Sequence, residues 1–217
     1  MTRRDILEMI ETGEALKIEF KQKFSTFEKI AKEIIAFANT SGGCIIFGVS
    51  DKRRILGVES EKSTAALVEQ TINDYTEPAV KFKIHYFDIE NKEIVVIEIP
   101  ESNDKPHRIK DYLPEMDINS AQVFVRVNDK SVLASKEMIR ILRIRNENRE
   151  LHKYKVGKIE QKVFEFLEKN ETINVKQLGE AANISYRRAS RTLINLLRAD
   201  MINIHTKDNG EDFFTAV

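Results

Sequence analysis

The chain has 217 residues, with 35 basic and 35 acidic side chains, and 41% of its residues are hydrophobic. This length and composition predict a folded, soluble protein with one large or two small domains. No apolar run reaches the length of a membrane span, and the charged first residues lack the apolar core of a signal peptide. Cys44 is the only cysteine, which excludes an intrachain disulfide and a zinc site built from clustered cysteines. We therefore expect a reducing, cytoplasmic location and no membrane partner.

The formal net charge is zero, so the chain has no global basic excess to attract nucleic acid. One segment departs from this balance: Arg140 to Lys158 contains seven basic residues, and its only acids are Glu147 and Glu150. Such a run is typical of a phosphate-binding segment, and equally of a solvated helix face or a linker. The sequence leaves both interpretations open.

Helix and strand patterns alternate over residues 1–150, which predicts a mixed α/β domain with a boundary near His152 to Gly157. The apolar run from Cys44 to Val49 indicates a buried strand. In chain order the patterns predict a short helix over Asp5 to Glu11, a strand over Leu16 to Lys21, a helix over Thr26 to Asn39, the strand Cys44 to Val49, a short strand over Ile55 to Val58, a helix over Ser63 to Tyr75, a hairpin of Val80 to Ile89 with Glu93 to Ile99, a strand over Gln122 to Val127, and a helix from Ser135 to about Glu150.

Residues 151–217 give a different order: helix, short helix, tight turn, longer helix and hairpin. The predicted elements are helices over Lys158 to Lys169 and Val175 to Ala182, a turn at Asn183-Ile184, a helix capped by Ser185 that runs to Ala199, and strands over Met201 to His205 and Asp212 to Ala216 around Asn209-Gly210. This order resembles the winged helix-turn-helix of many bacterial regulators. The fold class expected for the whole chain is α+β, with a mixed α/β domain followed by a winged helix-turn-helix.

The longer helix of this second region carries the strongest nucleic-acid signal. Its apolar positions form one stripe, made of Ala189, Leu193, Leu196 and Leu197. The residues predicted to bind nucleic acid are Ser185, Tyr186, Arg187, Arg188, Ser190, Arg191 and Asn195, with Lys207 at the wing. Arginine side chains hold phosphates and read guanine edges, which suits a helix whose first turns enter a major groove. The alternative is a module that binds protein or forms a dimer.

The spacing of Gly42 and Gly43, with no Lys-Ser/Thr pair after them, excludes a P-loop. The two glycines follow a helix and precede a strand, which excludes a dinucleotide fingerprint. The stretches from Glu14 to Lys21 and from Ala36 to Asp51 resemble the Alba-type domain of the Schlafen family in its short bacterial form. The resemblance covers about Glu11 to Ile144. It includes Arg126 in the closing strand and Lys105-Pro106-His107, but the family's usual Gly-Ser is replaced here by Asn128-Asp129.

The resemblance implies a nucleic-acid-binding domain, and bacterial members with a C-terminal winged helix are read as transcriptional regulators. Other members cut structured RNA with three carboxylates, which match Glu14, Glu19 and Asp51. Such a cluster would bind Mg²⁺ or Mn²⁺, with Lys21 beside the phosphate. The alternative is structural: Glu19 and Lys21 would be a pair on an edge strand and Asp51 an ordinary turn residue. This chain also has one copy of a domain that the active members duplicate.

These patterns together predict a DNA-binding transcriptional regulator that binds double-stranded DNA as a homodimer. The rival is a metal-dependent endoribonuclease of Schlafen type. A third class is a protein-interaction module of a defence or toxin system. The histidines do not form a recognisable metal set, and a lone His107 is more typical of a structural residue than of a phosphate ligand.

Overall fold

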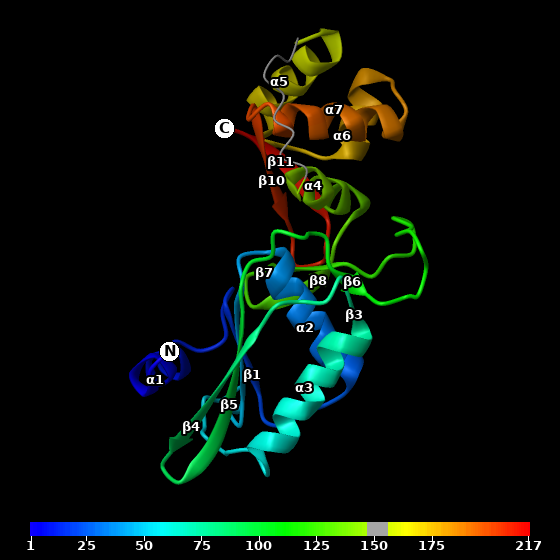
Figure 1. Ribbon diagram of the computed structural model, residues 1–217. Helices are drawn as coiled ribbons and strands as arrows, with labels where there is room; N and C mark the ends of the chain where they lie inside the picture. Colours follow the sequence, from blue (N-terminus) through cyan, green and yellow to red (C-terminus); the bar gives the residue numbers. More distant parts are fainter. Residues whose placement is uncertain (147–155) are drawn as a thin grey trace. The chain divides into compact units, whose positions relative to one another are not determined.

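The computed structural model describes residues 1–146 and 156–217 (Figure 1). Its architecture is α+β, as expected, and its contacts divide it into two compact units, Met1–Ala134 and Ser135–Val217. The predicted boundary near His152 to Gly157 lies mostly outside the described residues. By contacts, the helix that begins after Ser135 groups with the second unit.

The first unit is built around a four-stranded sheet of order β1-β2-β5-β4, in which β1 and β2 are parallel and the other pairs antiparallel. Its elements are α1 (Arg3–Thr12), β1 (Ile18–Lys21), α2 (Phe27–Asn39), β2 (Gly43–Phe47), α3 (Glu61–Tyr75), β3 (Thr76–Glu77), β4 (Lys83–Ile89), β5 (Lys92–Ile99), β6 (Arg108–Ile109), β7 (Phe124–Val127) and β8 (Lys130–Leu133).

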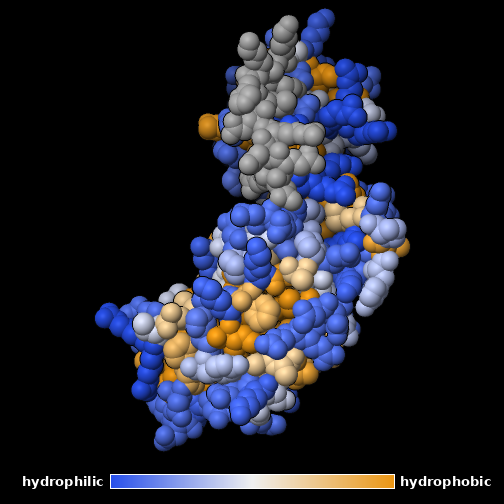
Figure 2. Space-filling model, viewed as in Figure 1, coloured by the Kyte–Doolittle hydropathy of each residue, from blue (hydrophilic) through white to orange (hydrophobic). Residues whose placement is uncertain are grey.

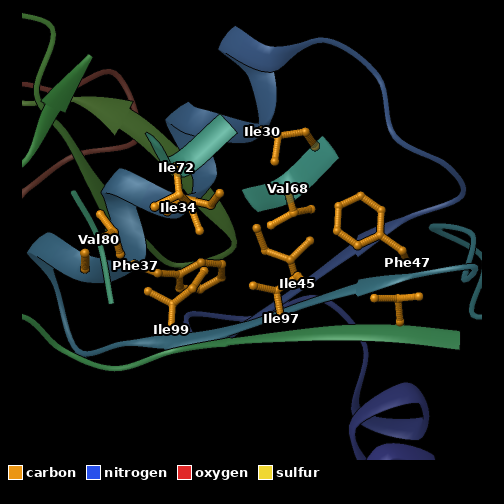
Figure 3. Packing of buried hydrophobic residues seen from close by; sticks show 12 residues of the cluster. Ile30, Ile34, Phe37, Ile45, Phe47, Val68, Ile72, Val80, Ile97 and Ile99 are labelled. Atoms are coloured by element: carbon orange, nitrogen blue, oxygen red, sulfur yellow. The ribbon is translucent and has the colours of Figure 1, made fainter. Parts of the chain in front are cut away.

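Helix α2 begins where the sequence predicts, because the Thr26 hydroxyl accepts a hydrogen bond from the Lys29 backbone N–H. Its buried stripe includes Ile30, Ile34 and Phe37. These side chains meet α3 and the inner face of β2 and β5 in a single apolar cluster (Figure 3). Burying this stripe is what fixes α2 against the sheet.

Strand β2 is buried on both faces, which explains its continuous apolar sequence. Ile45 and Phe47 point to the cluster beneath α2 and α3. Cys44 and Ile46 point to the opposite face, where Ile6 of α1 joins a second cluster. On the side seen in Figure 2, hydrophobic residues also gather in a surface patch beside α3.

Two small pairings close the first unit: β3 with β6, and β7 with β8. The sequence did not predict the two-residue strands, and the predicted strand over Ile55 to Val58 is wrong, because only Ile55 forms a bridge, to Val49. Among the described residues, no helix is both long and apolar enough to cross a membrane.

The second unit contains the predicted order of helices and hairpin. Its elements are α4 (Lys136–Asn146), α5 (Lys158–Asn170), β9 (Thr172–Ile173), α6 (Val175–Ala182), α7 (Tyr186–Arg198), β10 (Ile202–Thr206) and β11 (Asp212–Ala216). Strand β11 pairs with both β10 and β9 in an antiparallel sheet of three strands. The core is formed where α5, α6 and α7 meet this sheet, around Val163, Leu178, Leu193 and Phe214.

Asp212 gives the second unit a pH-dependent stability. Burial raises the pKa of the Asp212 carboxyl, against hydrogen bonds from Ser135 and Thr206, and the nearby Glu137 raises it further. Folding therefore favours the protonated form, and stability is lost as pH rises from about 4, near the ordinary pKa of 3.8, through the raised pKa.

Asp212→Asn removes this titration. We expect the free energy of unfolding of the wild type to fall relative to that of the variant as pH rises from 4 to 7. Urea unfolding at several pH values measures the difference. A constant difference across this range would show that the Asp212 carboxyl does not titrate as its burial implies.

Candidate nucleic-acid interface

Helix α7 follows a tight turn after α6. Helix α6 ends with Asn183 in a left-handed conformation, and the Ser185 hydroxyl then caps α7 by accepting the Arg188 backbone N–H at 3.4 Å. The predicted N-cap is therefore confirmed. Gly179 lets the two helices approach closely, because an added Cβ would lie 2.9 Å from the Tyr186 ring.

The exposed side of α7 is strongly basic. Ala189, Leu193 and Leu196 are fully buried, as their spacing predicts. The opposite side carries Arg187, Arg188 and Arg191, which are exposed. Within residues 1–146 and 156–217, these three guanidinium groups have no ion pair or hydrogen bond. Among the residues that the structure describes, they are therefore cations without a counter-charge.

Three other predicted contact residues differ in exposure. Tyr186 is 57% exposed at the first turn of α7, and Asn195 is half-buried two turns further on. Lys207 lies between β10 and β11, where its ammonium group is 3.6 Å from Glu211. This ion pair partly neutralises Lys207, so the loop between β10 and β11 contributes less free positive charge than the arginines of α7.

The prediction that Ser190 faces outward is wrong. Ser190 is only 3% exposed, and its hydroxyl donates to Glu137 at 2.8 Å and accepts from Arg140 at 3.1 Å. Both partners lie on α4, which packs against this side of α7. Ser190 therefore joins two helices of the second unit instead of presenting a hydroxyl to a ligand.

The structure describes only part of the basic run from Arg140 to Lys158. Arg140 pairs with Glu137 at 3.0 Å, so this cation has an internal partner. Residues 147–155 lie outside the described part of the chain. The role of the run in binding stays a prediction.

Of the carboxylates proposed for RNA cleavage, Glu14 precedes β1, Glu19 lies in β1 and Asp51 follows β2. Glu14 accepts the Phe20 backbone N–H at 3.1 Å. Desolvation raises the pKa of the Glu14 carboxyl, and the charges of Glu19 and Asp51 raise it further, against the Phe20 N–H and Lys21. Asp51 is exposed in the turn after β2. The three carboxylates are thus close enough for their charges to interact.

Both oxygens of Glu19 already contact a cationic side chain. One oxygen accepts from Lys21, and the other accepts from Arg126 at 2.9 Å. In the ranges that the structure describes, no three acidic, histidine or cysteine side chains are grouped so that they could hold a metal. The arrangement seen here therefore does not fit Mg²⁺ or Mn²⁺. The pair of Glu19 and Lys21 is the one that the structural interpretation predicts.

Arg126 is the centre of a buried network that the sequence did not predict. Its guanidinium group is fully buried and contacts Glu19, then Glu33 at 3.2 Å and Ser131 at 3.2 Å. It also donates to the Ala15 carbonyl at 2.8 Å. Strand β7 is thereby tied to β1 and α2. The resemblance singled out Arg126, but nothing in the sequence indicated its partners.

His107 is also a structural residue, as its isolation in the sequence predicts. It is 1% exposed, and its ring nitrogens contact the Pro78 carbonyl and the Ser102 hydroxyl, both at 2.7 Å. Its backbone N–H donates to Asn39 at 2.7 Å. Burial lowers the pKa of the His107 imidazole, so a neutral ring is favoured over a phosphate-binding cation.

Comparisons with known proteins concern mainly the first unit. The family described as Schlafen, AlbA_2 matches residues 14–135. A protein from Ureaplasma parvum, described as an uncharacterized ATP-binding protein, is 28% identical over an alignment of 188 residues that covers 76% of this chain and 50% of that protein. The chain thus spans about half the length of this curated relative.

Two solved structures are similar to part of this chain. The N-terminal domain of a RecG-related protein from Nitrosomonas europaea has a TM-score of 0.42 and 23% identity, over 52% of this chain and 84% of that one. A protein from Corynebacterium diphtheriae has a TM-score of 0.41 and 19% identity, over 59% of this chain and 26% of that one. Neither likeness supports an inference about function.

Proposed function

The chain belongs to the Schlafen, AlbA_2 family, and from this premise we propose that it is a DNA-binding transcriptional regulator. The observation that carries the proposal is the exposed basic side of α7. Arg187, Arg188 and Arg191 lie within five residues, and in the described part of the chain no acid neutralises them. Three unpaired cations on one helix suit the closely spaced phosphates of a nucleic acid.

The order of the elements supports double-stranded DNA as the partner. Helix α6, the turn at Asn183 and helix α7 correspond to a helix-turn-helix, and β10 with β11 corresponds to a wing. In this motif the N-terminal residues of the second helix contact bases in the major groove. Tyr186, Arg187 and Arg188 occupy that end of α7.

In this proposal the arginines of α7 and the polar residues near them make different contacts with the duplex. Guanidinium groups hold phosphates and read guanine, while Asn195 suits adenine. Ser185 and Lys207 add contacts to the backbone, from the cap of α7 and from the wing. We include a two-fold homodimer, because duplex half-sites are commonly palindromic and a dimer matches that symmetry.

The salt dependence of duplex binding by the full chain tests the proposal. Each neutralised phosphate contributes a slope of about −0.9 to log K against log salt concentration, so three arginine contacts give about −2.7 or steeper. Fluorescence anisotropy with a labelled random duplex measures this slope. No binding even at about 50 mM salt would instead favour a protein-interaction module.

A metal-dependent endoribonuclease of Schlafen type is the second candidate. One observation favours it: Glu14, Glu19 and Asp51 lie near enough to each other that the charges of Glu19 and Asp51 raise the pKa of the Glu14 carboxyl. Against it, Lys21 and Arg126 hold both oxygens of Glu19. Cleavage would require Glu19 to leave at least one of these partners.

We expect transfer RNA to stay intact when it is incubated with the wild type and Mn²⁺, and gel electrophoresis checks this. Cleavage that is lost in Asp51→Asn and Glu14→Gln, but kept in Asp88→Asn, would support the nuclease instead. These variants are more informative than Glu19→Ala, because removing Glu19 also disturbs the buried Arg126. Metal dependence would appear as loss of cleavage on adding a chelator.

A further inference from the structure

A hollow of about 610 Å³ lies in the second unit, between the first turn of α5 and the exposed side of α7. Its walls come from residues 157–160 and from residues 185–195. This volume is within the range of small-molecule sites in proteins, about 300–1,000 Å³. A helix that only lay in a DNA groove would not need a concavity of this size beside it.

The charge of the hollow is strongly positive. Lys158, Arg187, Arg188 and Arg191 line it, and the acidic side chain among the described lining residues is Glu160. A Glu160 oxygen accepts the Gly157 backbone N–H at 3.0 Å, so it serves as a cap for α5. The balance of the lining therefore favours an anion with more than one negative charge.

The backbone adds to this preference. Helices α5 and α7, each of 13 residues, both begin at the hollow, after Gly157 and Ser185. The N-terminal N–H groups and dipole of a helix favour phosphate. Thr192, which is 6% exposed, and the half-buried Asn195 complete the wall with groups that can bond to phosphate or hydroxyl oxygens.

The lining also indicates what kind of anion fits. Among the described lining residues there is no aromatic side chain on which a nucleobase could stack. Polar groups and cations dominate, with Ile159 as the apolar exception. A compact phosphorylated molecule, such as a pyrophosphate or a sugar phosphate, matches this lining better than a nucleotide.

We infer that this hollow binds a small phosphorylated anion, and that the bound anion competes with the duplex. Arg187, Arg188 and Arg191 cannot neutralise both ligands at once, so occupation of the hollow lowers the affinity for DNA. The competition rests on the proposed function, whereas the binding of the anion does not. The chemistry shared by the ligand and the duplex is the phosphate group.

The first experiment titrates pyrophosphate, inorganic phosphate and ribose 5-phosphate into the full chain by calorimetry, without DNA. Pyrophosphate is expected to bind saturably at one site per chain, and Arg188→Gln with Arg191→Gln to weaken it at least tenfold. Lys169→Gln, which removes a charge at the far end of α5, is the matched control and should bind as the wild type does. If pyrophosphate gave no more heat of binding than chloride does at equal ionic strength, the assignment of an anion site would be overturned.

The second experiment adds pyrophosphate to the complex with labelled duplex and follows anisotropy. Half-displacement is expected at a concentration set by the calorimetric affinity, while chloride at equal ionic strength displaces much less. Saturation of the hollow without displacement would overturn the competition. Duplex binding with no pyrophosphate binding would mean that DNA phosphate alone uses these arginines, and would overturn the inference. Pyrophosphate binding without any duplex binding would leave the anion site standing and refute the proposed function.

Discussion

Arg126→Met is expected to lower the free energy of unfolding of the first unit by about 3–5 kcal/mol. The guanidinium group is fully buried and contacts Glu19, Glu33 and three backbone carbonyls of residues 15–18. Met replaces the aliphatic stem of Arg126 but leaves Glu19 and Glu33 poorly solvated and without the counter-charge of the guanidinium group. Removing one partner of a buried ion pair is costly for this reason.

Hydrogen exchange followed by mass spectrometry measures this effect locally, because peptides from β1, α2 and β7 report on the first unit. We expect those peptides to lose protection, and the peptides of α5 and α6 to keep it. Arg3→Met, at an exposed position, is the matched control. Adding Glu19→Gln and Glu33→Gln should restore part of the lost stability by removing the stranded charges. A loss of less than about 1 kcal/mol in Arg126→Met would show that the network adds little to stability.

Local patterns predicted much of the fold. The spacing of Ile30, Ile34 and Phe37 gave the buried side of α2, and Thr26 and Ser185 are N-caps as expected. These features depend on residues within one or two turns of each other, so a single sequence contains the information. Strands β3 and β6 are each only two residues long, and their pairing joins residues that are about 30 positions apart in the chain. No local sequence pattern therefore indicates this pairing.

The candidate site was predictable only on its solvent side. Exposure of Arg187, Arg188 and Arg191 follows from the apolar stripe opposite them. The burial of Ser190 does not, because its partners on α4 lie about 50 residues earlier in the chain. Arg126 meets Glu19 across an even longer separation of 107 residues. The sequence alone therefore does not show which buried polar side chains contact each other across the fold.

Arg187→Ala, Arg188→Ala and Arg191→Ala in one chain are expected to weaken duplex binding at least about 100-fold, since each lost contact costs about 1–3 kcal/mol. The slope of log K against log salt concentration should also become shallower by about 2.7. The three side chains have no internal partner in residues 1–146 and 156–217, so their removal should not unfold the second unit.

Two controls separate the local cluster from net charge and from packing. Lys62→Ala, Lys81→Ala and Lys83→Ala together remove the same charge from exposed positions of the first unit, and should leave the affinity nearly unchanged. Ser190→Ala should reduce the stability of the second unit by about 1–3 kcal/mol and leave the salt slope as it is, because its hydroxyl is buried against α4.

The most direct test of the account is the duplex affinity of the triple arginine variant, compared with that of the triple lysine variant, from about 50 to 200 mM salt. The account predicts that the arginine variant loses at least about 100-fold in affinity and most of its salt dependence, while the lysine variant binds like the wild type. Equal affinities for the two variants would contradict it, because binding would then depend on total charge and not on the exposed side of α7.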